Sequence, residues 1–301
     1  ISSSFWDTET VGLNSACGND TYNKCAATPL TTAQALIQTS YPDWDFTNDW
    51  FMVEDSTRPF LRTEWSTVIQ NSHQLQLMEL DLSAQYTLSK NIDFEATFED
   101  DSRSDMWATG AGHGYGFEPI GSRSTSFTGT LDGQGHAITG LYIHRNGLSN
   151  VGLFGHISGG EVRDLDLKSG FISGDSYTGM LAGETDSGSQ ITQVHATGSV
   201  TGTSMTGGLV GNHYGKLTGS SSSATINGQF NVGGLVGHLD TGGEINRSFA
   251  ASHVTGMDFV GGLVGRNERG QVHNAYATGS VSGRAEVGGL VGRNVGKIGT
   301  T

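Results

Sequence analysis

One short motif bounded by glycines occurs six times, and this repeat constrains the fold more than any other feature. The motif is GGLVG at four occurrences and VGLFG or GMLAG at the other two. Its closing glycines are spaced by 28, 28, 26, 28 and 27 residues, and they are Gly155, Gly183, Gly211, Gly237, Gly265 and Gly292. A repeat of roughly 20–50 residues is typical of solenoids, propellers and helical arrays.

Within each period, short runs rich in β-branched residues alternate with glycine turns, which indicates strands. Examples are ITQVHATGSVTG at 191–202 and VHNAYATGSVSG at 272–283. Residues 151–301 contain 34 glycines, which helices tolerate poorly. We therefore predict an all-β chain: a parallel β-solenoid with about 27 residues and two or three strands per coil.

A single coil of this size cannot bury its own apolar side chains, so stacked coils must share one core. The motif leucines should form a ladder along that core, and they are Leu153, Leu181, Leu209, Leu235, Leu263 and Leu290. A second ladder is expected from Val200, Ile226, Val254 and Val281. Glycines at the motif ends should allow turns with positive φ or close approach between coils.

Composition and charge exclude several classes of protein. The net charge is −14, and residues 1–150 carry −12 of it (7 Lys+Arg against 19 Asp+Glu). Such a surface repels phosphate backbones, so nucleic acid is not an expected partner. No apolar run approaches the ~18 residues that a membrane span needs, so membrane insertion is not expected.

Cys17 and Cys25 lie eight residues apart in a short polar loop, CGNDTYNKC. A local disulfide in an exported protein is the preferred interpretation. The alternative is a pair of free thiols, and the two cysteines lack the neighbouring ligands of a zinc site.

The GGLVGxN motif followed by GxIxxSxAxG resembles the GLUG repeat of large bacterial surface and secreted proteins. The similarity extends upstream, to 3–10, 44–62, 73–94 and 127–143, and so covers nearly the whole chain. Many such proteins are similar to filamentous-haemagglutinin-type adhesins. The resemblance implies a right-handed parallel β-helix and an extracellular, adhesive or structural role.

The chain is expected to divide into four parts. Residues 1–6 continue a solenoid coil from residue 301 of a preceding copy, 7–62 form a small α+β insert, 63–150 start the β-helix under a helix, and 151–301 form the repeat solenoid. A short helix through Gln38 should be capped by Thr31 or Thr32, and a second helix is expected at 72–79. Aromatic residues at 44–60 should form a small core in the insert, or a platform for sugars if exposed.

The two ends of the chain are complementary in sequence. The last motif, GGLVGRNVGKI, lacks the second half of its coil, and ISSSFW at 1–6 is similar to INRSFA at 245–250, which is that half of an earlier coil. We therefore expect copies to follow one another end to end. The residues expected at this junction are Ile1, Phe5, Trp6, Ile298 and Thr301. The alternatives are a filament of stacked subunits and a segment cut inside a domain.

Signals for catalysis or metal binding are weak. Clustered acids at 93–105 suit a solvated loop or Ca²⁺ ligands, but their spacing matches no known calcium loop. His156 and His238 share a column with Glu184, Asn212 and two arginines, which suggests an exposed polar ladder. HExxH and GxSxG are absent. For a β-helix hydrolase the nearest candidate is Asp132, in an expected turn.

These observations predict an extracellular structural or adhesive repeat unit of a surface adhesin or fibre. Its expected partners are copies of itself and a host or matrix glycan. We predict no catalytic residue, no metal site and no cofactor. The alternatives are a carbohydrate-binding module and a polysaccharide-degrading β-helix enzyme.

Overall fold

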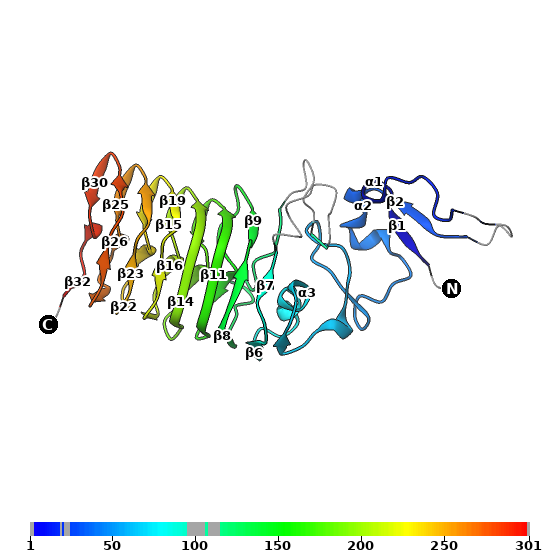
Figure 1. The fold of residues 1–301 in the computed structure, drawn as a ribbon, viewed down its shortest axis with the longest axis horizontal. Coiled ribbons are helices and arrows are strands. Elements are labelled where there is room, and N and C mark those ends of the chain that lie inside the picture. Colours follow the sequence, from blue (N-terminus) through cyan, green and yellow to red (C-terminus); the bar gives the residue numbers. More distant parts are fainter. Residues whose placement is uncertain (1–2, 19, 21–24, 95–105, 108–114, 300–301) are drawn as a thin grey trace. The chain divides into compact units, whose positions relative to one another are not determined.

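The computed structural model describes residues 3–18, 20, 25–94, 106–107 and 115–299 (Figure 1). The chain forms two compact units. Residues 1–65 and 96–118 make up the first, which we call the aromatic unit. Residues 66–95 and 119–301 make up the second, the solenoid unit.

The solenoid unit is a stack of coils whose strands pair in parallel with the same strand of the next coil (Figure 1). One side is a six-stranded sheet of β10 (Phe154–Ile157), β13 (Ala182–Thr185), β16 (Val210–His213), β21 (Val236–Leu239), β26 (Val264–Asn267) and β31 (Val291–Asn294). A second side is a five-stranded sheet of β12 (Ser176–Gly179), β15 (Ser204–Gly207), β20 (Phe230–Gly233), β25 (Asp258–Gly261) and β30 (Ala285–Gly288).

The remaining strands wind around the rest of each coil. The first of them are β5 (Val68–Ile69), β6 (Gln85–Leu88), β7 (Ile92–Asp93), β8 (Thr130–Thr139) and β9 (Tyr142–His144). The two longest are β11 (Glu161–Ser173) and β14 (Gln190–Thr201). Later coils divide the same path into β17 (Lys216–Thr218), β18 (Ser221–Ser222), β19 (Thr225–Asn227), β22 (Glu244–Asn246), β23 (Phe249–Ala250), β24 (His253–Thr255), β27 (Gln271–His273), β28 (Tyr276–Ala277), β29 (Val281–Ser282) and β32 (Lys297–Ile298). The predicted β-solenoid is confirmed.

The motif leucines line the core in consecutive coils. Each backbone N–H from Leu181 to Leu263 donates to the carbonyl of the next leucine, at 2.8–2.9 Å. Five of the six leucines are fully buried, and Leu290, in the last coil, is half-buried. The second ladder pairs Val200 with Ile226, Ile226 with Val254, and Val254 with Val281.

The coils bend at residues that we did not expect. Two residues in most coils take a positive φ without being glycine, as in Gln193 (54°) and Met205 (52°). Such a conformation costs roughly 1 kcal/mol or more for a residue with a Cβ. The motif glycines instead serve close packing, because a Cβ on Gly233 would lie 2.0 Å from the carbonyl oxygen of Val236.

A short helical segment lies at the start of the solenoid unit. Helix α3 (Ser72–Gln76) begins at Asn71, whose Oδ1 accepts a hydrogen bond from the Gln74 N–H at 2.9 Å. The chain then tightens into the 3₁₀ turn η3 (Leu77–Leu80) instead of continuing as one α-helix to residue 79. Leu75, Leu77 and Met78 are completely buried.

The aromatic unit is built from short elements. Strand β1 (Phe5–Asp7) pairs in parallel with β2 (Thr28–Leu30), and β3 (Trp50–Phe51) pairs antiparallel with β4 (Phe60–Leu61). The helical pieces are α1 (Thr8–Val11), α2 (Thr32–Ala35), η1 (Gln38–Ser40) and η2 (Arg62–Glu64). Thr31 and Gln34 form a capping box, but α2 ends at Ala35, three residues before the expected end.

The boundary expected at residues 62 and 63 also needs correction. Residues 96–118 belong to the aromatic unit, not to a continuous segment 63–150. The physical reason is Trp107, which is fully buried and packs on Phe60 and Phe117 with ring centroids 5.8 and 5.9 Å apart. No helix in the described part of the chain is long and apolar enough to cross a membrane.

We expect His213 to make the solenoid unit less stable in acid. Its side chain is fully buried in β16, and burial lowers its pKa from the usual value of about 6.5 to about 4. As the pH falls below 6.5, the unfolded chain binds a proton that the folded chain does not. We therefore expect about 3 kcal/mol of stability to be lost between pH 6.5 and pH 4.

The test compares the free energy of unfolding of the wild type and of His213→Leu across this pH range. Leucine is a native choice here, because Leu239 pairs with His213 in the next coil. The variant should lose less stability than the wild type on acidification. Equal losses would contradict the assignment.

Candidate functional site

The predicted junction residues lie in both units. Phe5 and Trp6 form part of β1 in the aromatic unit, and Ile298 lies in β32 of the solenoid unit, opposite Val272. Ile1 and Thr301 lie outside the described residues. Within the described part of the chain, β1 pairs with β2 alone, so its other edge has no strand beside it.

The last coil exposes side chains that earlier coils bury. Val287 and Ile298 are 44% and 43% exposed, whereas Val260 and Val272, their counterparts one coil earlier, are 0% and 2% exposed. Strands β28 and β29 have no described strand on their outer edge. This outer edge of the solenoid therefore has the backbone groups and apolar side chains that an inner coil offers to its neighbour.

A stacked aromatic pair marks this same edge. The rings of Phe249 and Tyr276 are parallel within 2°, with centroids 5.0 Å apart. Tyr276 is 55% exposed, because no described residue stacks on its outer face. When residues 1–6 are aligned with residues 245–250, Phe5 corresponds to Phe249, the first ring of this pair.

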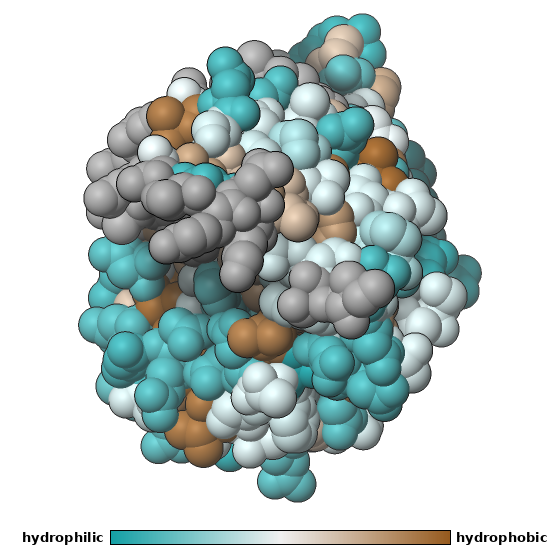
Figure 2. Space-filling view, turned by 90° about the vertical axis from the view of Figure 1, so that its right-hand side faces the viewer, coloured by the Kyte–Doolittle hydropathy of each residue, from teal (hydrophilic) through white to brown (hydrophobic). Residues whose placement is uncertain are grey.

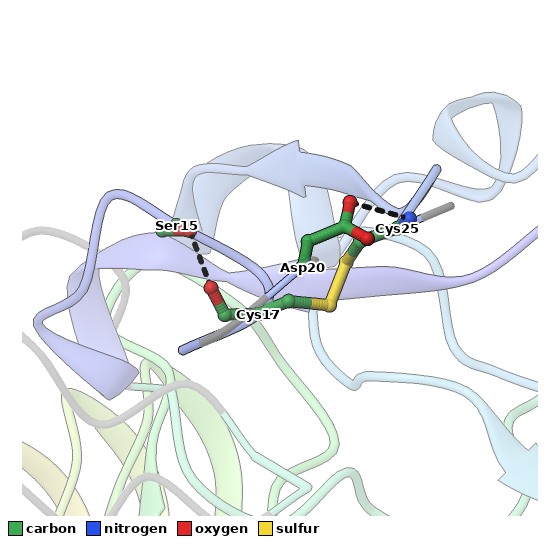
Figure 3. The surroundings of a disulfide bond; sticks show 4 residues. All are labelled: Ser15, Cys17, Asp20 and Cys25. Atoms are coloured by element: carbon green, nitrogen blue, oxygen red, sulfur yellow. Dashed lines mark hydrogen bonds between the residues drawn. A yellow bond between two sulfur atoms is a disulfide. The ribbon is translucent and has the colours of Figure 1, made fainter. Parts of the chain in front are cut away.

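A disulfide bond joins Cys17 and Cys25 in the structure (Figure 3). The Cys25 N–H donates to Asp20 Oδ2 at 2.9 Å, and Ser15 Oγ donates to the Cys17 carbonyl at 2.9 Å. The bond closes a short polar loop of the aromatic unit. Stable disulfides are typical of oxidising compartments outside the cytosol.

The polar column that was expected to be exposed is mostly buried, so that prediction was wrong. His156, Glu184, Asn212 and His238 are 3–7% exposed. They are partly satisfied by one another and by a surface arginine: the Glu184 carboxylate pairs with Arg123 at 2.6 Å and accepts from Asn212 at 3.0 Å. Among the described residues, His238 Nε2 has no hydrogen-bond partner. Burial lowers the pKa of His238, although the negative charge of Asp240 acts to raise it.

His156 also lies between a serine hydroxyl and carboxylates. Nucleophilic hydrolases use a similar arrangement of hydroxyl, imidazole and carboxylate. Its Nδ1 is 2.7 Å from Ser126 Oγ, and its Nε2 is 3.4 Å from Asp186. The Ser126 hydroxyl also lies 3.1 Å from the Ser122 carbonyl, so its single proton can go to either acceptor, depending on the tautomer of His156. His156 is 5% exposed, and its contacts to Ser126 and Asp186 join neighbouring coils.

Asp132 lies in strand β8, and the expectation of a turn at this position was wrong. Gln134 and Gly135 take positive φ values of 53° and 75°, and the pairing of β8 with β11 shifts register between Asp132 and His136, so the strand is irregular just after Asp132. Burial disfavours the charged carboxylate of Asp132, but the Gln134 N–H and the Arg163 guanidinium outweigh it and lower its pKa. An ionised carboxylate held by arginine at 2.8 Å is poorly suited to act as a general acid.

The acidic segment 93–105 lies outside the described residues from Glu95 onward. Among the residues that the structure describes, no group of three or more His, Cys, Asp or Glu side chains is placed to hold a metal ion.

The aromatic unit holds the rings of Tyr41, Trp44 and Trp50 in a stack. Their centroids are 4.9 Å apart between Tyr41 and Trp44 and 3.9 Å apart between Trp44 and Trp50. Phe5 packs edge-on against Tyr41 and Trp44. The face in Figure 2 is mostly hydrophilic, and its hydrophobic residues form small separate patches.

Comparison with known proteins identifies the repeat. Residues 260–282 match the family model "the GLUG motif". Halomucin of Haloquadratum walsbyi is 38% identical over an alignment of 241 positions, which covers 67% of this chain and 2% of halomucin. An immunoglobulin A1 protease of Streptococcus pneumoniae is 31% identical over an alignment of 161 positions, which covers 48% of this chain and 8% of the protease.

A solved structure of an IgA1 protease superposes with a TM-score of 0.55 at 21% identity, covering 75% of this chain and 17% of that chain. This likeness concerns the fold alone. The chain spans only a small part of each of these relatives. Residues 260–282 carry the GLUG motif, and the resemblance of this chain to GLUG-motif repeat proteins is thereby confirmed.

Proposed function

We propose that this chain is an extracellular structural and adhesive segment of a longer repeat protein, and that its solenoid continues through the outer edge of the last coil. The observation that carries the proposal is the exposed apolar and hydrogen-bonding edge at β28, β29 and β32. The repeat motif and the small share of each relative that the chain covers support it. A stack of hydrogen-bonded coils is suited to a stiff spacer.

The strand that continues the stack is proposed to be β1 of a following copy. Its Phe5 would lie on Tyr276, as Tyr276 lies on Phe249. The parallel pairing of β1 with β2 supports this, because a continuing solenoid needs a parallel strand with one free edge. Ile298 of one copy and Phe5 of the next copy would be eight residues apart in the joined chain. The equivalent residues of an inner coil, Ile245 and Phe249, are four residues apart, so the connection at the junction would be four residues longer.

A double-mutant cycle tests this junction. Two copies joined from Thr301 to Ile1 should show a coupling energy of about 0.5–1.5 kcal/mol between Tyr276→Ala in the first copy and Phe5→Ala in the second. The measurement is the free energy of unfolding of the two single variants and the double variant.

The same substitutions in a single copy are the control, and there they should be additive. Phe249→Ala with Tyr276→Ala should couple in both chains, because that pair is already stacked. Additivity of Tyr276 and Phe5 in the joined chain would contradict the proposed junction.

The extracellular setting predicts that Cys17 and Cys25 are oxidised in the native protein. Cells of the source organism would be lysed into a thiol-alkylating reagent, and the labelled cysteines identified by mass spectrometry. We expect labelling only after reduction. Free thiols in the unreduced sample would contradict export to an oxidising compartment.

A further inference from the structure

The aromatic unit contains an open groove of about 610 Å³. Its walls come from η1, the chain that follows η1, and the turn after β3. The lining residues are Gln38, Thr39, Tyr41, Pro42, Trp44, Phe46 and Glu54. All of them lie in the described residues of one compact unit.

The aromatic wall of the groove is rigid. Trp44 is held by its stacked neighbours and by its indole N–H, which donates to the Ser3 carbonyl at 3.1 Å. Tyr41 is held by its hydroxyl, which donates to the Ala35 carbonyl at 2.8 Å. Tyr41 is 5% exposed and the faces of Trp44 are covered by its stacked neighbours, so the apolar surface open to a ligand comes from the edge of Trp44 and from Pro42 and Phe46. Side chains fixed in this way bind a ligand at little cost in conformational entropy.

The polar rim of the groove has hydrogen-bonding capacity to spare. Within the part of the chain that the structure describes, neither the Thr39 hydroxyl nor the Gln38 side-chain amide has a hydrogen-bond partner. Glu54 accepts the Gln38 backbone N–H through Oε2 at 3.0 Å, which leaves Oε1 available. Hydroxyl, amide and carboxylate together supply both donors and acceptors.

Aromatic surface beside uncommitted polar groups matches the chemistry of a sugar, which has apolar C–H faces and a rim of hydroxyls. Small-ligand sites commonly combine such apolar walls with a few placed polar groups. The net charge of the aromatic unit indicates which class of glycan would bind. Residues 1–65 and 96–118 hold 14 Asp+Glu and 4 Lys+Arg, a net charge of −10, which disfavours anionic glycans.

We propose that the groove lined by Thr39, Trp44 and Glu54 binds a neutral oligosaccharide. The inference deepens the adhesive part of the proposed function and rests on it, since an exported segment meets glycans. The stacking of Phe5 on Tyr276 is tested separately, so failure of glycan binding and failure of the junction are distinguishable.

The experiment screens the whole 301-residue chain, with its disulfide intact, on immobilised neutral oligosaccharides ending in glucose, galactose or their N-acetylamino derivatives. Sialylated and sulfated counterparts are screened in parallel. The strongest neutral ligand is then titrated by calorimetry against Thr39→Val and Glu54→Gln. Asp55→Asn is the matched control, because it removes one charge beside Glu54 without lining the groove, and asparagine tolerates the positive φ at this position (61°).

We expect the affinity to fall about two- to tenfold in Thr39→Val and about tenfold or more in Glu54→Gln. Asp55→Asn should bind within about twofold of the wild type. The near-ultraviolet circular dichroism should stay unchanged in all three variants, which shows that the tryptophan stack is intact. The proposal is overturned by binding of no neutral glycan, by binding of anionic glycans only, or by variants that bind as the wild type does.

Discussion

The structure of the solenoid depends on the parallel backbone hydrogen bonds that join each coil to the next. They bring equivalent residues of successive coils together, so that Leu209 follows Leu181 and Leu235 follows Leu209 along the core. A coil with a neighbour on one side only leaves the backbone groups of its other edge without a strand partner. Its core residues are then partly exposed, as in Leu290 and Val287. An open edge of this kind favours pairing with a further strand unless it is capped, and this is the physical basis of the proposed continuation.

The same stacking determines where chemistry is possible in the solenoid. Side chains of one column lie close enough to satisfy one another, as Asn212 does with Glu184 and with His238. Many polar side chains of the column are thereby hydrogen-bonded within the stack, although Nε2 of His213 and of His238 has no partner among the described residues. The aromatic unit differs, because its rim residues Thr39 and Glu54 keep unused hydrogen-bonding capacity beside fixed rings. This contrast supports a division between a spacer in the solenoid and ligand binding in the aromatic unit.

The repeat period predicted the solenoid. Local signals predicted a cap at Thr31 or Thr32 and a helix starting at residue 72, because both depend on short-range patterns, and the structure has the cap at Thr31. The sequence could not show that non-glycine residues such as Tyr177 and Phe259 take positive φ, which their propensities disfavour. Their rings contact Arg123 and Arg293, and Arg123 in turn pairs with Glu184 of the buried polar column. The link between Trp107 and Phe60 is a long-range contact without a local signal. The groove in the aromatic unit also depends on tertiary packing, although the aromatic residues themselves were visible in the sequence.

Hydrogen–deuterium exchange of the outer edge of the last coil tests the central claim most directly. The comparison is between the isolated 301-residue chain and the native protein as it is purified from its source organism. The relevant amide is that of Ala277, whose counterpart Ala250 is covered by the next coil. If the solenoid continues, exchange at Ala277 should be fast in the isolated chain and as slow as at Ala250 in the native protein. Fast exchange at Ala277 in both forms would mean that no further strand covers this edge.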